Sequence, residues 1–98
     1  MREYEVTVIF QTNLDDEARS ALIERVSGWL THSDTEEDKP VQNVWGQRRL
    51  AYPIKNNHEG YYILFDAMLD PERLADIERN MQYADDILRY MIVRKEVV

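Results

Sequence analysis

The fold is decided by residues 61–72, which read YYILFDAMLDPE. The first nine are almost all apolar, and the β-branched and aromatic residues among them favour an extended strand. Asp70 and Pro71 then form a typical helix start, because a capping side chain precedes a proline whose missing N–H is not needed there. Apolar residues recur after it at helical spacing, at Leu74, Ile77 and Met81. The pattern predicts a strand over 61–69 and a helix that ends near Gln82.

The beginning of the chain repeats this succession. Residues 2–10, REYEVTVIF, alternate with a period of two, which predicts a strand with one buried face. Asn13 or Asp15 can cap a following helix, and the acids after it suit the positive end of the helix dipole. Apolar residues then recur at Ala18, Leu22, Val26 and Trp29. We expect this helix to run to about Leu30.

Three further segments complete the order. Val41 to Ile54 is a second extended stretch, in which Gly46 is expected to mark a bulge or bend and Pro53 to end the strand or confine it to a sheet edge. Residues 56–60 are a turn cluster before the third strand. Residues 87–95 form a fourth strand.

The resulting order is strand, helix, strand, strand, helix, strand. Two βαβ units with right-handed crossovers give a four-stranded antiparallel sheet with both helices on one face. We therefore predict an α+β, ferredoxin-like βαββαβ fold, formed as a single domain by residues 1–98. In this fold the other face of the sheet has no helix over it.

The alternation of side chains assigns each strand residue to one face. The expected core residues are Val6, Val8, Ile63, Phe65, Leu69, Tyr90 and Ile92, with Leu88 in the same set as Tyr90. The uncovered face is expected to carry an apolar patch of Ile9, Tyr62, Leu64, Met91 and Val93. A monomer rarely exposes a large patch of this kind without a partner. A register slip of one residue would exchange the two sets.

Composition sets limits on function. The chain has 98 residues, 44% of them hydrophobic, which is enough for one core, and it has no cysteine for disulfides or thiolate chemistry. Its net charge of −7 argues against a nucleic-acid binder that acts alone. The charge is uneven: residues 1–40 hold ten acids and four bases, whereas residues 41–98 hold nine acids and eight bases. The second half can therefore offer a local basic patch, and residues 31–40 are expected to form a mobile polar loop.

Catalytic and metal-binding motifs are missing from the sequence. The two histidines, His32 and His58, fall in polar segments without metal-ligand spacing, and the acids of residues 34–38 lack the pattern of a calcium loop. Phosphate-binding glycine loops and nucleophile motifs are also absent. We expect no enzyme activity, no cofactor, no metal and no small-molecule substrate. No apolar run approaches the length of a membrane span.

The most basic segment is residues 48–55, RRLAYPIK, which holds three cations and no acid. Arginine side chains can grip phosphates, and Tyr52 can stack on a base or donate a hydrogen bond. The alternative is a sheet edge that charge protects from aggregation. Arg2 and Arg89, on the first and fourth strands, can extend a basic margin, or can be ordinary solvated charges.

Several motifs together resemble one known family. They are residues 1–5 (MREYE), residues 13–15 (NLD), residues 46–55 (GQRRLAYPIK) and the GYY of residues 60–62. The chain resembles the bacterial sixth ribosomal protein of the small subunit over residues 1–96, and the RRLAYPIK string is the most specific part. One departure is the loop at residues 32–40, which is more acidic than is usual in the family.

The resemblance implies a structural protein of the cytoplasmic small ribosomal subunit. It implies a heterodimer with the basic eighteenth small-subunit protein, and joint binding of a helical junction in the central domain of the small-subunit ribosomal RNA, at the platform. The family pattern matches at Tyr4 as well, which can be a core residue only. The residues expected to contact RNA are Arg2, Arg48, Arg49, Tyr52, Lys55 and Arg89. The residues expected to contact the partner are Tyr62, Leu64, Met91 and Val93.

A different class of protein also fits the predicted fold. Ferredoxin-like regulatory domains dimerise sheet to sheet and bind a small ligand. Association with ribosomal subunits at high magnesium, lost at high salt, would favour the ribosomal alternative. A homodimer whose elution shifts with a ligand would favour the regulatory one.

Overall fold

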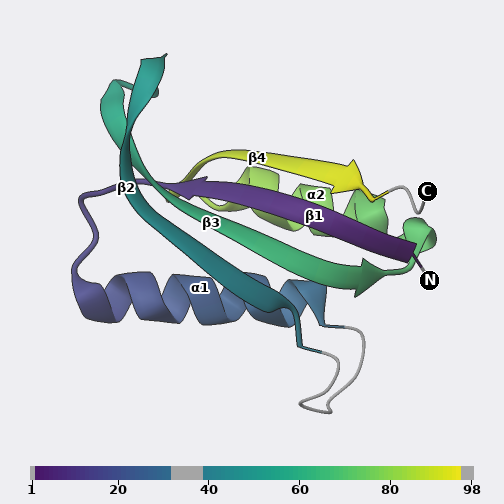
Figure 1. Cartoon of the computed structure of the whole chain (residues 1–98). Helices are drawn as coiled ribbons and strands as arrows, with labels where there is room; N and C mark the ends of the chain where they lie inside the picture. Colours follow the sequence, from purple (N-terminus) through teal and green to yellow (C-terminus); the bar gives the residue numbers. More distant parts are fainter. Residues whose placement is uncertain (1, 32–38, 96–98) are drawn as a thin grey trace.

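The computed structural model describes residues 2–31 and 39–95, and it contains the predicted elements in the predicted order (Figure 1). The elements are β1 (Arg2–Phe10), α1 (Asp16–Leu30), β2 (Val41–Ile54), β3 (Asn57–Leu69), the 3₁₀ turn η2 (Pro71–Arg73), α2 (Leu74–Tyr83) and β4 (Ile87–Arg94). Most of the expected mobile loop, residues 32–38, lies outside the described residues.

The four strands form one antiparallel sheet in the order β2-β3-β1-β4. Both helices lie on one face of it, because apolar residues of α1 and α2 share a single core with β1 and β3. This arrangement confirms the predicted ferredoxin-like fold. We call the other side of the sheet the open face.

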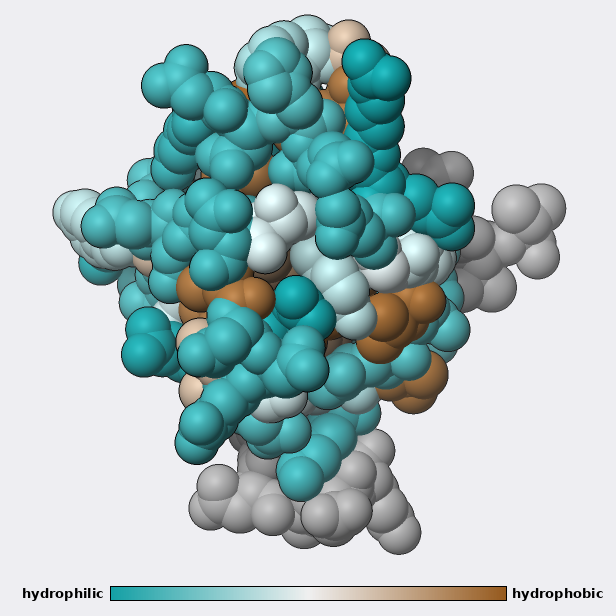
Figure 2. Space-filling view, turned by 90° about the vertical axis from the view of Figure 1, so that its left-hand side faces the viewer, coloured by the Kyte–Doolittle hydropathy of each residue, from teal (hydrophilic) through white to brown (hydrophobic). Residues whose placement is uncertain are grey.

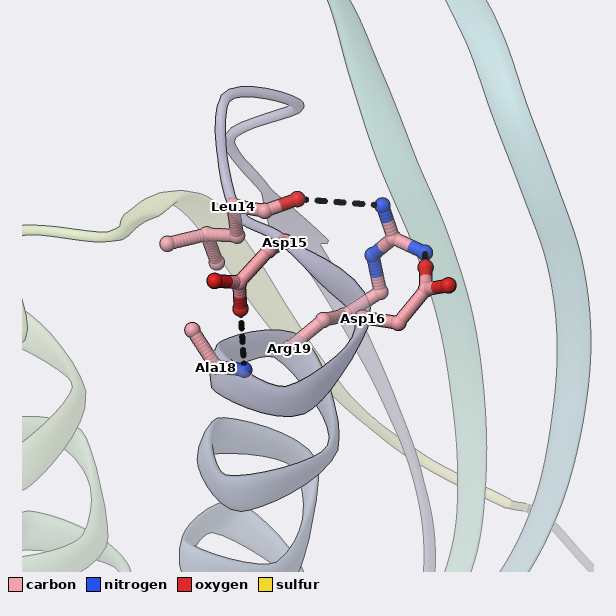
Figure 3. Close-up of polar contacts among 5 residues, drawn as sticks. All are labelled: Leu14, Asp15, Asp16, Ala18 and Arg19. Atoms are coloured by element: carbon pink, nitrogen blue, oxygen red, sulfur yellow. Dashed lines mark hydrogen bonds and ion pairs between the residues drawn. The ribbon is translucent and has the colours of Figure 1, made fainter.

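Asp15 caps α1, and Asp70 caps the 3₁₀ turn that leads into α2, which itself begins at Leu74. The Asp15 carboxylate accepts a hydrogen bond from the Ala18 backbone N–H at 2.7 Å (Figure 3). Arg19, in the first turns of α1, donates to the Leu14 carbonyl and lies with its guanidinium 4.5 Å from the centre of the Tyr61 ring. These contacts join the start of α1 to β3. In the same way Asp70 accepts from the Glu72 N–H at 3.0 Å, and a 3₁₀ turn precedes α2.

The core lies between the helices and the middle strands. Val6 pairs with Phe65 and Val8 with Ile63 across β1 and β3, and all four side chains are fully buried. The remaining buried members include Tyr4, Phe10, Leu22, Val26, Leu30, Leu69, Ile77, Met81 and Ile87. The predicted core is therefore confirmed on β1 and β3. Tyr90 and Ile92 on the edge strand β4 are only partly buried.

A bulge corrects the prediction for Leu88. Ile9 pairs with Arg89 but Phe10 pairs with Ile87, so Leu88 is an extra residue on β4. One extra residue reverses the side to which the following side chains point. Leu88 therefore does not join Tyr90 in the main core. It packs with Ile9 and Leu50 in a second buried cluster on the open face.

The hairpin between β2 and β3 is tighter than the sequence indicated. The third strand begins at Asn57 rather than Tyr61, because the turn consists only of Lys55 and Asn56, at φ values of 48° and 66°. Two such left-handed residues suit the twist of a hairpin, and asparagine tolerates this conformation. Pro53 lies between Arg49 and Ile54, where the ladder on this edge strand is interrupted, as a proline without an N–H requires.

Two glycines allow the backbone geometry of this hairpin. Gly46, at φ 81°, follows the extra residue Trp45 at a register shift in β2, which confirms the predicted bulge. Gly60 faces Ile9, and a Cβ at this position would lie 2.3 Å from the Ile9 Cγ2 atom. Only glycine therefore allows the hairpin to lie so close to β1.

The register leads to a test of stability. Phe65→Ala should lower the free energy of unfolding by about 3–5 kcal/mol, because this aromatic side chain is fully buried. Tyr62→Ala should cost less than half as much, since this neighbour lies half-buried on the open face. Urea unfolding of both variants measures the difference. The reverse order of stability would mean that the strand register is off by one residue.

Candidate RNA and partner interface

The basic segment, residues 48–55, forms the end of β2 and the first residue of the turn. Arg48 pairs with Gly60 and Arg49 with Glu59, and both arginine side chains are exposed. Successive residues of a strand point to opposite sides. The two guanidinium groups therefore leave the hairpin on opposite sides, and the hairpin carries positive charge on both.

The tip of the hairpin folds onto the beginning of β4. Leu50 is buried against Ile9 and Leu88. The Lys55 ammonium donates to the Ile87 carbonyl at 3.5 Å, and the Arg89 guanidinium donates to the Tyr52 hydroxyl. Three of the six residues expected to contact RNA, Tyr52, Lys55 and Arg89, are thus brought together, with Arg48 and Arg49 on the same hairpin.

Arg2 does not join this group. It is the first residue of β1 and pairs with Leu69, whereas the hairpin tip lies beyond the other end of β1 (Figure 1). Its alternation with Tyr4 places it on the side of the helices. Any contact that Arg2 makes with RNA is therefore separate from those of the hairpin.

The end of the molecule that carries the hairpin is mainly hydrophilic. Viewed from that end, the surface is largely polar, and its hydrophobic areas are small and separate (Figure 2). A surface of this kind suits contact with a hydrated phosphate backbone better than burial against an apolar protein surface.

The open face has a different character. The register places Tyr62 and Leu64 of β3 and Met91 and Val93 of β4 on this face, opposite residues of β1. Met91 is 55% exposed and Val93 is 48% exposed, whereas Tyr62 and Leu64 are half-buried. The expected exposure of Ile9 is wrong: only 7% of it is accessible, because Leu50 and Leu88 cover it.

Trp45 of β2 is a further member of this face. Its ring stacks on that of Tyr62, with centroids 6.3 Å apart and planes 8° from parallel, and the residue is 50% exposed. The neighbouring Gly46 was the sequence signal for this position of Trp45, because a bulge at the glycine shifts the alternation of side chains along β2. Val41, which pairs with Asp66, and Met68, which pairs with Glu3, also lie exposed on this face.

Charged groups occupy the middle of the open face. The Lys95 ammonium lies 2.7 Å from one Asp66 oxygen and 3.9 Å from a Glu5 oxygen, and Asn43 donates to Asp66 at 3.2 Å. The hydrogen bond to Asp66 is the main cause that raises the pKa of Lys95. Two carboxylates and one ammonium leave this part of the face acidic.

Metal clusters and membrane-spanning helices are both absent from the described part of the chain. No group of three or more histidine, aspartate or glutamate side chains there is arranged to hold a metal ion. Among the helices of residues 2–31 and 39–95, none is long and apolar enough to cross a membrane. The candidate site consists of the two surfaces described above, the basic hairpin end and the largely apolar open face.

Comparison with known proteins identifies the family. The model for the family described as Ribosomal protein S6 matches residues 3–94. Small ribosomal subunit protein bS6 from Clostridium novyi (strain NT) is 40% identical over 98 residues, which cover 98% of this chain and 99% of that protein. Its counterpart from Exiguobacterium sibiricum is 38% identical over 96 residues, with coverages of 98% and 99%.

A solved structure agrees with these relatives. The crystal structure of 30S ribosomal protein S6 from Thermotoga maritima matches with a TM-score of 0.84 and 28% identity, over 96% of this chain and 87% of that one. The family match favours the ribosomal alternative over a regulatory domain and confirms the expectation that the chain is not an enzyme. The chain belongs to the ribosomal protein S6 family and is a structural, non-enzymatic ribosomal protein.

Proposed function

We propose that this protein is a structural constituent of the small (30S) ribosomal subunit in the bacterial cytoplasm. There it binds small-subunit ribosomal RNA in the central domain, at the platform, as a heterodimer with the eighteenth small-subunit ribosomal protein, and so supports translation. Family membership supports the place in the subunit. The observation that carries the RNA-binding role is the gathering of cations at the hairpin end of a protein whose net charge is −7.

The positive charge of the basic surface is smaller than the net negative charge of the whole protein. Arg48, Arg49, Lys55 and Arg89 lie at one end of the molecule, whereas most of the acidic excess belongs to residues 1–40. A polyanion is attracted by local cations but repelled by the net charge of the whole protein. A basic partner would reverse this balance, which is why we assign RNA binding to the heterodimer.

The open face suits the partner. Its exposed aromatic and aliphatic side chains can supply the anchors that dominate most protein interfaces. The acidic groups Glu5 and Asp66 in its middle would attract a basic protein. The apolar residues and the carboxylates between them therefore both favour a basic protein over RNA at this face.

RNA binding should depend on the partner. The protein alone should bind a central-domain fragment of ribosomal RNA weakly, because its net charge of −7 opposes association. Addition of the eighteenth small-subunit protein should give a tight ternary complex. Filter binding with and without the partner, over a range of salt concentrations, tests this. Tight and salt-resistant binding by this chain alone would contradict the proposal.

Charge reversal on the hairpin should weaken ternary assembly and spare the fold. Each of Arg48→Glu and Arg49→Glu removes a cation from an exposed position, so stability should change by about 0.5 kcal/mol or less. The dependence of log affinity on log salt should flatten by about one unit for each phosphate that the variant no longer binds. Arg25→Glu, on the exposed side of α1, is the matched control. Unchanged assembly and an unchanged salt slope would mean that residues 48–55 do not bind RNA and are only a charged edge of the sheet.

The open face should control affinity for the partner protein. Tyr62→Ala removes the aromatic ring on which Trp45 stacks, so calorimetric titration with the partner should show binding weaker by about 1–2 kcal/mol. Tyr83→Ala, on the opposite side of the molecule and 79% exposed, is the control. Phe65→Ala should bind normally once corrected for its unfolded fraction. If Tyr62→Ala and the unmodified protein bind the partner with equal affinity, the partner does not bind at this part of the open face.

A further inference from the structure

We propose that Lys55 and Arg89 together bind one phosphate group of the RNA backbone, and that Tyr52 is a positioning residue which holds the Arg89 guanidinium in place. The inference rests on the proposed function and gives these residues distinct roles in one site. Tyr52 and Arg89 are 37 positions apart in the sequence, and their contact exists only because the hairpin folds onto β4.

A hollow of about 280 Å³ lies where the hairpin tip, the beginning of β4 and the end of α2 meet. Its polar lining consists of Lys55, Arg89, the Gln82 amide and Tyr90. The Gln82 side chain donates to the Tyr90 hydroxyl at 3.0 Å. A hollow of this size has room for a phosphate and some of its water.

The charge of this hollow is opposite to that of the protein. Its described lining residues include two cations and no acid, although the chain as a whole has a net charge of −7. The acid just before β4, Asp86, accepts a hydrogen bond from the Gln11 side chain. The lining therefore favours an anion over a cation or a neutral ligand.

The contact between Tyr52 and Arg89 prepares the site before RNA arrives. The Tyr52 hydroxyl accepts one N–H of the guanidinium, which leaves the other donors of the planar fork for a phosphate. A free arginine side chain has many rotamers, and their loss opposes binding. Tyr52 is 56% exposed, but its backbone is restricted by the buried Leu50 two residues before it and by Pro53 after it. The hydroxyl can therefore hold the guanidinium in one orientation.

Lys55 completes the site from the turn. Its ammonium donates to the Ile87 carbonyl at 3.5 Å, over 32 positions of sequence, and thus stays above the beginning of β4. An ammonium has three donors, so two remain for the oxygens of the phosphate. The two cations reach the hollow from the hairpin turn and from β4, and a single phosphate can contact both.

The test is a double-mutant cycle on the RNA affinity of the heterodimer, measured over a series of salt concentrations with a central-domain RNA fragment. Tyr52→Phe keeps the ring and removes only the hydroxyl, and it should weaken binding about three- to tenfold. Its salt slope should flatten toward that of Arg89→Gln, by up to about one unit. Tyr52→Phe combined with Arg89→Gln should bind no more weakly than Arg89→Gln alone. Tyr83→Phe, on an exposed tyrosine of α2, is the matched control.

Two results would overturn the inference. If Tyr52 stacks directly on a base, Tyr52→Phe will keep full affinity, and Tyr52→Ala will add its effect to that of Arg89→Gln. If Arg89→Gln and Lys55→Gln bind normally while Arg48→Glu binds weakly, the phosphate site is wrong but the proposed function stands. Normal binding by all the basic variants would instead contradict the proposed function itself. Urea unfolding of each variant excludes loss of the fold as the cause.

Discussion

Strand β1 lies between β3 and β4, and the alternation of its side chains determines both surfaces of the sheet. Val6 and Val8 point to the helices and are fully buried, while Glu5 and Thr7 point to the open face. Because the neighbouring strands pair residue by residue with β1, its register also decides which residues of β3 and β4 reach the core. The stability of the core and the composition of the partner surface thus depend on the same register.

Much of the fold could be predicted because the signals are local. The capping side chains of Asp15 and Asp70, the proline after Asp70 and the two periodicities are features of neighbouring residues. The exceptions are places where the backbone changes register. At Leu88 an extra residue reverses the alternation, and at Lys55 a two-residue turn lets β3 begin four residues earlier than expected. A periodic pattern assumes a constant register and cannot locate such irregularities.

The candidate site was predictable in composition but not in geometry. The charges of residues 48–55 mark the segment in the sequence itself. Its contact with Arg89 depends on the hairpin folding over β1, a long-range event that Gly60 permits by its lack of a side chain. The same event buries Ile9, which the sequence placed on an exposed patch. Arg2 has the same charge as the hairpin residues, but only the pairing of β1 with its neighbours shows that Arg2 lies at the other end of the sheet.

The uneven charge of the molecule connects its two surfaces. The hairpin tip presents cations over a hollow whose described lining has no acid, and the open face presents Glu5 and Asp66 beside a single ammonium. Screening in cytoplasmic salt limits each field to about 8 Å, so the two surfaces can have opposite preferences within one small domain. Binding of a basic protein to the open face would neutralise carboxylates that otherwise oppose RNA. Because the screening length is much shorter than the domain, the partner would strengthen RNA binding mainly through cations of its own that contact the RNA.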